Sequence, residues 1–314
     1  MATPPSDAIS LAMSHPPRQR KQKSSAPSEP ALAQVKEADD AVPEPTLDKQ
    51  KRKSVDWEIP RKALHSSIGF FTLWLYATGG SPQHVVLGLA AALCIILPAD
   101  VLRLHYAPFE RFYESVLGFL MRESEKRKTN GVIWYIVGVI WVLAFYPPDI
   151  ATVAILLLSW ADTAASTFGR LWGRYTPPLP RRLLGLPLAP RKSLAGFLAA
   201  AITGTTITAG FWLLLAPAVD PAAASWSFAD GVRAQGVDES VVGGAVREWL
   251  NSLGFEGIPT GGWTGIAGIS VASGVVTALA EALDVGSLDD NLTLPIIAGG
   301  GLWACLKALS WLSA

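Results

Sequence analysis

Residues 158–196 read LSWADTAASTFGRLWGRYTPPLPRRLLGLPLAPRKSLAG, and this stretch decides how the rest of the chain can be organised. It begins inside an apolar run of membrane-spanning character, and this run contains Asp162. A carboxylate inside a bilayer costs about 2.5–3.5 kcal/mol on insertion scales, so a functional role is the first interpretation. Small residues and basic loops can serve packing and topology alone, but neither purpose explains Asp162.

The residues after Asp162 recur at helical spacing. Steps of four, seven and eleven residues lead to Ser166, Gly169 and Gly173, which a helix places on one narrow stripe with Asp162. The glycines let a ligand approach the backbone closely. Basic residues follow, with no acidic residue among them: Arg170, Arg174, Arg181, Arg182, Arg191 and Lys192. An acid for a metal, glycines for close approach and basic groups for phosphates predict a polyphosphate site at a membrane surface.

The composition predicts an all-α integral membrane protein in two parts. Half of the 314 residues are apolar, and these are concentrated after residue 62. Residues 1–55 are rich in Pro, Ser, Ala and Lys and lack a sustained apolar period, which predicts a disordered cytosolic tail. Residues 56–314 are the expected membrane-embedded domain. The formal net charge is zero, so the overall charge does not indicate a nucleic-acid partner.

Seven apolar runs predict about seven transmembrane helices: 63–78, 85–102, 131–146, 150–169, 194–216, 263–283 and 292–312. Residues 108–130 place Phe and Leu among charged residues at helical spacing, which indicates one amphipathic helix at the membrane interface. Lys and Arg concentrate before the first run, between the second and third, and between the fourth and fifth. The positive-inside rule then predicts a cytosolic N-terminus and a lumenal C-terminus.

This orientation brings polar residues from the whole domain to or near the cytosolic side: Arg61, Lys62, Asp100, Lys128, Asp162, Lys192, Glu281, Asp284 and Asp290. Their convergence on one face predicts a single site. His65 follows Arg61 by one turn, so the first helix begins with a basic triplet that either serves the site or only anchors the helix. Asp100 and Arg103 are three residues apart and are expected to pair.

These motifs resemble a known family. DTAASTFGRLWGR at 162–174, followed by RKSLAG at 191–196, is similar to the CTP-using membrane kinases of polyprenols, phytol and diacylglycerol, which are related to phosphatidate cytidylyltransferases. RKALH at 61–65, DVLR at 100–103 and DDNLTLP at 289–295 fit the kinases, and the C-terminal cytidylyltransferase signature is absent. The length and the hydrophilic tail most resemble the fungal-type CTP-dependent diacylglycerol kinases of the endoplasmic reticulum.

The resemblance implies that CTP phosphorylates diacylglycerol at the cytosolic face of the endoplasmic reticulum or nuclear envelope, giving phosphatidic acid and CDP. It implies Mg²⁺ as the metal and essential roles for Arg61, Lys62, Asp162 and Gly169. A kinase of another lipid alcohol (dolichol or phytol) and a phosphatidate cytidylyltransferase remain alternatives. A transporter is a further alternative, against which the missing internal repeat and the one-sided motifs count.

Each candidate residue has an expected role under this interpretation. The expected catalytic residues are Asp162, Arg61, Lys62 and Lys192. Because hard cations prefer oxygen ligands, the expected metal ligands are Asp162, Glu281, Asp284 and Asp290. The expected nucleotide-binding residues are Gly169, Arg170, Gly173, Arg174, Arg191, Ser193 and Gly196. Further candidates are His65, Asp100, Arg103, Lys128 and Asn291. No residue is assigned as a general base, and the absence of a Walker A sequence argues against soluble kinase folds.

Overall fold

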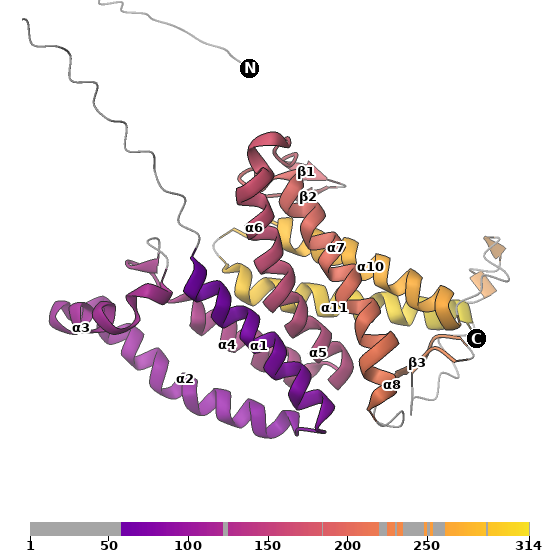
Figure 1. Ribbon diagram of the computed structural model, residues 1–314, viewed down its shortest axis with the longest axis horizontal. Coiled ribbons are helices and arrows are strands. Elements are labelled where there is room, and N and C mark those ends of the chain that lie inside the picture. Colours follow the sequence, from indigo (N-terminus) through magenta and orange to yellow (C-terminus); the bar gives the residue numbers. More distant parts are fainter. Residues whose placement is uncertain are drawn as a thin grey trace, which may run out of the picture. The chain divides into compact units, whose positions relative to one another are not determined.

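The protein is almost entirely helical in the computed structural model, which describes residues 58–121, 125–183, 185–219, 225–229, 231–234, 248–249, 252–253, 261–286 and 288–313 (Figure 1). These residues belong to one compact unit, Val55–Ala314. The tail predicted to be disordered, residues 1–55, lies outside the described residues. The boundary between the tail and the membrane domain therefore stays a prediction.

The first part of the described chain contains α1 (Ile59–Ala77), α2 (Pro82–His105), α3 (Ala107–Leu117), η1 (Gly118–Leu120), α4 (Gly131–Phe145), α5 (Pro148–Leu156), η3 (Leu157–Ala161), α6 (Asp162–Trp172) and η4 (Gly173–Tyr175). Proline lies in the first turn of α1, α2, α3 and α5. The missing N–H of proline costs nothing there, because the first N–H groups of a helix have no partner within the helix.

The second part contains β1 (Arg182–Leu183), β2 (Leu186–Pro187), α7 (Leu194–Gly210), η5 (Phe211–Leu215), α8 (Ala216–Ala218), β3 (Trp226–Ser227), β4 (Arg233–Ala234), α10 (Gly262–Ala282) and α11 (Asp290–Ser313). The strands form two short antiparallel hairpins, β1–β2 and β3–β4. Helices therefore make up the membrane domain, and the strands lie in its connecting loops.

In the part of the chain that the structure describes, five helical segments are long and apolar enough to cross a membrane: Pro82–His105, Pro148–Tyr175, Leu194–Ala218, Gly262–Ala282 and Asp290–Trp311. The predicted all-α membrane fold is confirmed, but the count of seven spans is not. α4 is strongly apolar but only 15 residues long. α1 has 19 residues, but Arg61, Lys62 and His65 in its first turns shorten its apolar part.

The span that carries Asp162 is longer than the predicted 150–169 and is not a uniform α-helix. It runs over Pro148–Tyr175 as α5, the π-helical η3, α6 and the 3₁₀-helical η4. The π-helical segment Leu157–Ala161 ends directly before Asp162. Such π-helical turns are rare and occur frequently at functional sites.

Close packing joins the helices around this span. α7 packs against both α6 and α10, and α10 also packs against α11. Small residues bring α7 and α10 together, since a Cβ added at Gly274 would lie 2.4 Å from the carbonyl oxygen of Ala201. Across the same contact, the Thr208 hydroxyl donates to Ser273 Oγ at 2.7 Å. The four helices thus form one packed group.

The loop between α6 and α7 docks on the C-terminal end of α10. The Ala189 N–H donates to the carbonyl oxygen of Ala282 at 2.9 Å, and the Asp284 N–H donates to that of Pro187 at 3.0 Å. This backbone pairing brings the RKSLAG segment beside Glu281, although about ninety residues separate the two in sequence.

The predicted pair of Asp100 and Arg103 is confirmed, and it is fully buried. Arg103 Nη2 lies 2.8 Å from Asp100 Oδ1, and the same guanidinium donates at 2.8 Å to the carbonyl oxygens of Lys126 and Lys128. Asp100 Oδ2 accepts from the N–H of Asn130. The pair therefore holds the chain between α3 and α4. α3 itself is shorter than the predicted helix at 108–130, and its location at a membrane interface stays a prediction.

Candidate functional site

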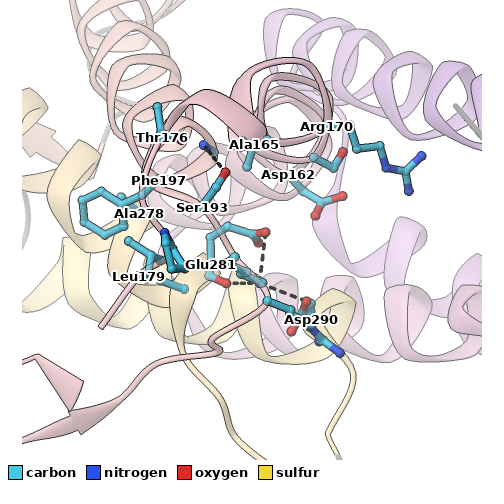
Figure 2. Close-up of a pocket in the computed structure, with 18 residues that line it drawn as sticks. Asp162, Ala165, Arg170, Thr176, Leu179, Ser193, Phe197, Ala278, Glu281 and Asp290 are labelled. Carbon is cyan, nitrogen blue, oxygen red and sulfur yellow. Dashed lines mark hydrogen bonds and ion pairs between the residues drawn. The ribbon is translucent and has the colours of Figure 1, made fainter. Parts of the chain in front are cut away.

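A cavity of about 520 Å³ lies among α6, α7, the end of α10 and the start of α11 (Figure 2). Ligand sites typically enclose about 300–1,000 Å³. The cavity is lined by many of the residues predicted to form the site: Asp162, Gly169, Arg170, Gly173, Arg191, Lys192, Ser193, Gly196, Glu281 and Asp290. The structure thus brings together residues from four separate segments of the sequence.

The stripe predicted on one face of a helix faces this cavity. Asp162, Ser166, Gly169 and Gly173 all belong to its lining, as the steps of four, seven and eleven residues predict. Asp162 is only 9% exposed. Among the described residues, none makes a hydrogen bond or salt bridge with its carboxylate, so Asp162 presents its oxygens to the cavity region without a direct partner.

The RKSLAG segment builds the N-terminus of α7 at the cavity wall. Ser193 is the N-cap residue, and its side chain accepts from the N–H of Gly196 at 3.3 Å. Thr176 Oγ1 accepts from the N–H of Ala195 at 3.2 Å. The positive end of the α7 dipole is therefore directed at a cavity lined by cationic side chains, an arrangement that favours anions.

The glycines at the site also have a packing role. A Cβ added at Gly196 would lie 2.9 Å from the carbonyl oxygen of Ala165, and one at Gly173 would lie 3.0 Å from Ser193 Oγ. Gly169 is less restricted, because its nearest neighbours would be 3.6 Å away. The close approach of α6 and α7 thus explains Gly196, while the expected contact of the glycines with a nucleotide stays a prediction.

Lys192 is the centre of an ion-pair cluster. Its Nζ lies 3.1 Å from Glu281 Oε1 and 3.1 Å from Asp290 Oδ2, and it also donates to the carbonyl oxygen of Glu281 (Figure 2). Burial on its own would lower the pKa of Lys192, but Glu281 and Asp290 raise it, and the net pKa lies above its usual value. Lys192 therefore carries its positive charge at neutral pH.

The carboxylates fit a metal ion that arrives with a polyphosphate. Glu281 and Asp162 are close enough to interact electrostatically, and the buried Glu281 Oε2 has no hydrogen-bond partner among the residues that the structure describes. Within the described part of the chain, no group of three or more His, Cys, Asp or Glu residues could hold a metal by itself. Mg²⁺ is usually bound by one or two carboxylates together with phosphates and waters, so this donor set suits it.

Arg61 and Lys62 do not line the cavity, but Lys62 contacts the helix that does, and Arg61 is joined to that helix through Glu58. Lys62 Nζ donates to Thr167 Oγ1 at 3.1 Å and interacts electrostatically with Asp162. Glu58 lies between two arginines: one of its oxygens is 3.3 Å from Arg61, and the other contacts Arg170. The N-terminal end of α1 is thus joined to α6 beside Asp162.

The remaining candidates lie outside the cavity wall. Arg174 is exposed and stacks over the Tyr175 ring at 4.5 Å, and exposed Asp284 accepts from the N–H of Gly286. Asn291 donates to the carbonyl oxygen of Gly131, joining α11 to α4. His65, Asp100, Arg103 and Lys128 also lie outside this wall. The structure gives these residues local contacts, and their functional roles stay predictions.

The structure also shows wall residues that the sequence did not indicate. Phe197, Leu179 and Ala278 lie on the side of the cavity opposite Asp162 and Arg170 (Figure 2). In the sequence, Phe197 cannot be told apart from the packing and lipid-facing residues of an apolar helix, so nothing there indicated a place at the site. The cavity consequently has an apolar side and a charged side, which matches the two halves of a nucleotide.

Comparison with known proteins places the chain in a family. No family model matches it, and no solved structure matches it. It is 37% identical to CTP-dependent diacylglycerol kinase 1 of Schizosaccharomyces pombe, over 80% of this chain and 93% of that protein. Identity to the proteins of the same name is 35% in Eremothecium gossypii and 33% in Saccharomyces cerevisiae, over 78% and 88% of this chain and 69% and 86% of those proteins. The chain therefore belongs to the family of CTP-dependent diacylglycerol kinases.

Proposed function

We propose that this protein transfers the γ-phosphoryl group of CTP to diacylglycerol, with phosphatidic acid and CDP as products. The proposal is carried by one observation: a membrane-helix cavity combines carboxylates, cationic side chains and a helix N-terminus with an apolar wall. The names of the relatives supply CTP and diacylglycerol as donor and acceptor. The combination suits a nucleotide whose phosphates meet a lipid at the edge of the membrane.

In this proposal the nucleotide lies across the cavity. Its phosphates contact Arg170, Arg191 and Lys192 near the N-terminus of α7, because cationic side chains and the positive end of a helix dipole attract phosphate oxygens. Its base lies against Phe197 and Leu179, which offer an aromatic face and an aliphatic surface. Lys192 then exchanges part of its interaction with Glu281 and Asp290 for phosphate oxygens.

The chemistry requires alignment and charge neutralisation more than a strong base. The lipid hydroxyl oxygen attacks the γ-phosphorus, the bond from that phosphorus to the β–γ bridging oxygen breaks, and CDP leaves while the hydroxyl proton is released. Cationic groups fixed around the phosphates stabilise the negative charge of the transferring group. When bound, Mg²⁺ supplies further positive charge there, and Asp162 and Glu281 would hold it.

We also propose that the site faces the cytosol in the endoplasmic reticulum membrane. The excess of Lys and Arg in alternate loops supports this orientation. A cysteine introduced in residues 176–180 should react with an impermeant reagent added from the cytosolic side, and one in residues 230–238 should react only after permeabilisation. The opposite pattern would separate the cavity from cytosolic CTP and contradict the orientation.

The activity is tested by following the label of CTP into lipid. Purified protein in mixed micelles with diacylglycerol and γ-labelled CTP should give labelled phosphatidic acid and CDP, and α-labelled CTP should leave the lipid unlabelled. Transfer of α-label to phosphatidic acid with release of pyrophosphate would identify a cytidylyltransferase instead. Transfer of γ-label to dolichol or phytol, but not to diacylglycerol, would contradict only the acceptor.

A further inference from the structure

A second cavity, of about 500 Å³, lies between α1, α2, α4 and α5, outside the site described above. Its lining runs along α1 from residue 64 to residue 76, a distance of about 18 Å at 1.5 Å per residue. One leaflet of a bilayer contributes about 15 Å of hydrocarbon. α1 and α2 diverge from the turn that joins them (Figure 1). Gly79 and Gly80 of this turn line the cavity together with residues of both helices.

The wall of this cavity is apolar along most of its length. Aliphatic side chains such as Ile68, Leu89 and Val139 face it. Two threonines in the wall use their hydroxyls within their own helices, because Thr72 donates to the carbonyl oxygen of Ile68 and Thr152 to that of Pro148. They therefore offer no free hydroxyl donor to a ligand, and the cavity is suited to a hydrocarbon chain.

One end of the cavity is polar, and it lies next to the proposed catalytic carboxylate. The His65 ring packs edge-on against Tyr135, with 4.8 Å between the ring centres. The Tyr135 hydroxyl lies 3.0 Å from Ser159 Oγ in the π-helical segment, three residues before Asp162. Tyr135 also interacts electrostatically with Asp162. Asp162 thus lines the first cavity and is electrostatically coupled to the polar end of the second.

We propose that the second cavity binds an acyl chain of the diacylglycerol and thereby brings the free hydroxyl of this lipid to Asp162, across from the nucleotide. This inference rests on the proposed kinase function. A phospholipid that only fills space has no need of a cavity whose polar end lies beside the segment that carries the catalytic carboxylate, whereas the acceptor lipid does. The Tyr135 hydroxyl can donate to an ester oxygen beside the reacting hydroxyl when it accepts from Ser159 Oγ.

Photocrosslinking tests the location without requiring turnover. A diacylglycerol with a diazirine at the end of one acyl chain is added to the full chain in lipid nanodiscs, for both wild type and Asp162→Asn. Label is expected on α1, α4 and α5 in both proteins, with competition by unlabelled diacylglycerol and not by phosphatidylcholine. Label spread over exposed Val271 and Val275 of α10, or equal competition by phosphatidylcholine, would overturn the inference. If these crosslinks form in wild type although wild type transfers no γ-label from CTP to diacylglycerol, the lipid site stands and the kinase proposal falls.

Filling the cavity provides a second test with a matched control. Thr72→Phe adds a ring inside the cavity. Thr206→Phe adds the same ring at an exposed position of α7. It is a matched control, because the Thr206 hydroxyl, like that of Thr72, donates to the carbonyl oxygen four residues earlier in its helix. Thr72→Phe should raise KM for dioleoylglycerol about tenfold, because a hydrophobic pocket discriminates fit on this scale. KM for CTP should be unchanged, and dioctanoylglycerol should be affected less.

Val139→Phe, compared with Val271→Phe on the exposed face of α10, repeats the test from the opposite wall of the cavity. CTP binding reports whether each variant is folded, so a folding failure is not mistaken for a lipid effect. Unchanged lipid KM values in both cavity variants, or equal changes in the exposed controls, would overturn the inference.

Discussion

Two ion-pair clusters differ in their burial and in what their charges do. In one, Arg103 and Asp100 are 0–2% exposed, and the guanidinium also binds carbonyl oxygens of the 125–128 segment. In the other, Lys192 bridges Glu281 and Asp290 at the wall of a cavity, and no described residue makes a hydrogen bond with Glu281 Oε2. The first cluster is saturated by its own chain and holds a loop. The second is incomplete and has room for a ligand.

The largest effect is expected from breaking the saturated cluster. Arg103→Leu leaves the buried carboxylate of Asp100 without its partner, so the free energy of unfolding should fall by about 3–5 kcal/mol. Thermal unfolding in detergent measures this loss. Asp100→Leu combined with Arg103→Leu should recover part of it. If Arg103→Leu instead unfolds at the same temperature as wild type but cannot transfer phosphate, Arg103 has a catalytic role.

Breaking the incomplete cluster around Lys192 should have the opposite effect, with a large loss of activity and a small loss of stability. Lys192→Met should lower kcat/KM by about 100- to 1,000-fold, because a fixed cation at a developing negative charge contributes on that scale, and it should change stability much less than Arg103→Leu. Steady-state kinetics and the unfolding midpoint measure both quantities. Near-normal turnover in Lys192→Met would remove it from the phosphate site.

The raised pKa of Lys192 adds a pH test of the same cluster. The stabilisation that charged Lys192 gives the fold is fully present below the usual pKa of 10.5. It is lost as the pH rises through the higher pKa that Lys192 has in the folded protein. Between pH 7 and 9, therefore, Lys192→Arg should follow the same rate profile as wild type. A wild-type decline in this range that Lys192→Arg removes would show that Lys192 loses its proton there.

The smallest effect is expected at a cationic residue outside the cavity. Arg174 belongs to the same sequence motif as Arg170, but it is exposed and stacks on Tyr175. Exposed charges contribute little, so Arg174→Ala should change kcat/KM by less than about threefold. Arg170→Ala is the matched comparison, since this residue lines the cavity. Equal losses in both variants would mean that the bound state recruits Arg174.

The sequence predicted the parts of this molecule that depend on local spacing. Asp162, Gly169 and Gly173 could be placed on one helical face because a helix repeats regularly, and an intramembrane carboxylate is rare enough to stand out. The confirmed pair of Asp100 and Arg103 follows from the same helical spacing. These signals lie within one segment and need no knowledge of its neighbours.

Features that depend on distant segments were not predictable in this way. The separation of Arg61 and Lys62 from the cavity wall depends on how α1 packs against α6. The ion pairs of Glu58 with Arg61 and Arg170 depend on the same packing. The apolar wall at Phe197 forms only when α7 meets α10. The count of seven spans stays a prediction, because it was made from apolar content alone, and five helical segments of the described chain are both long and apolar enough to cross a membrane.

Asp162 is the residue on which the proposed phosphoryl transfer depends most, because its carboxylate is expected to serve the reaction and not the fold. The most direct measurement compares γ-label transfer from CTP to diacylglycerol by wild type and Asp162→Asn at equal amounts of membrane-inserted protein. For Asp162→Asn we expect normal membrane insertion, an unfolding midpoint no lower than that of wild type, and a loss of turnover of about 1,000-fold or more. Wild-type turnover in Asp162→Asn would contradict the proposed site.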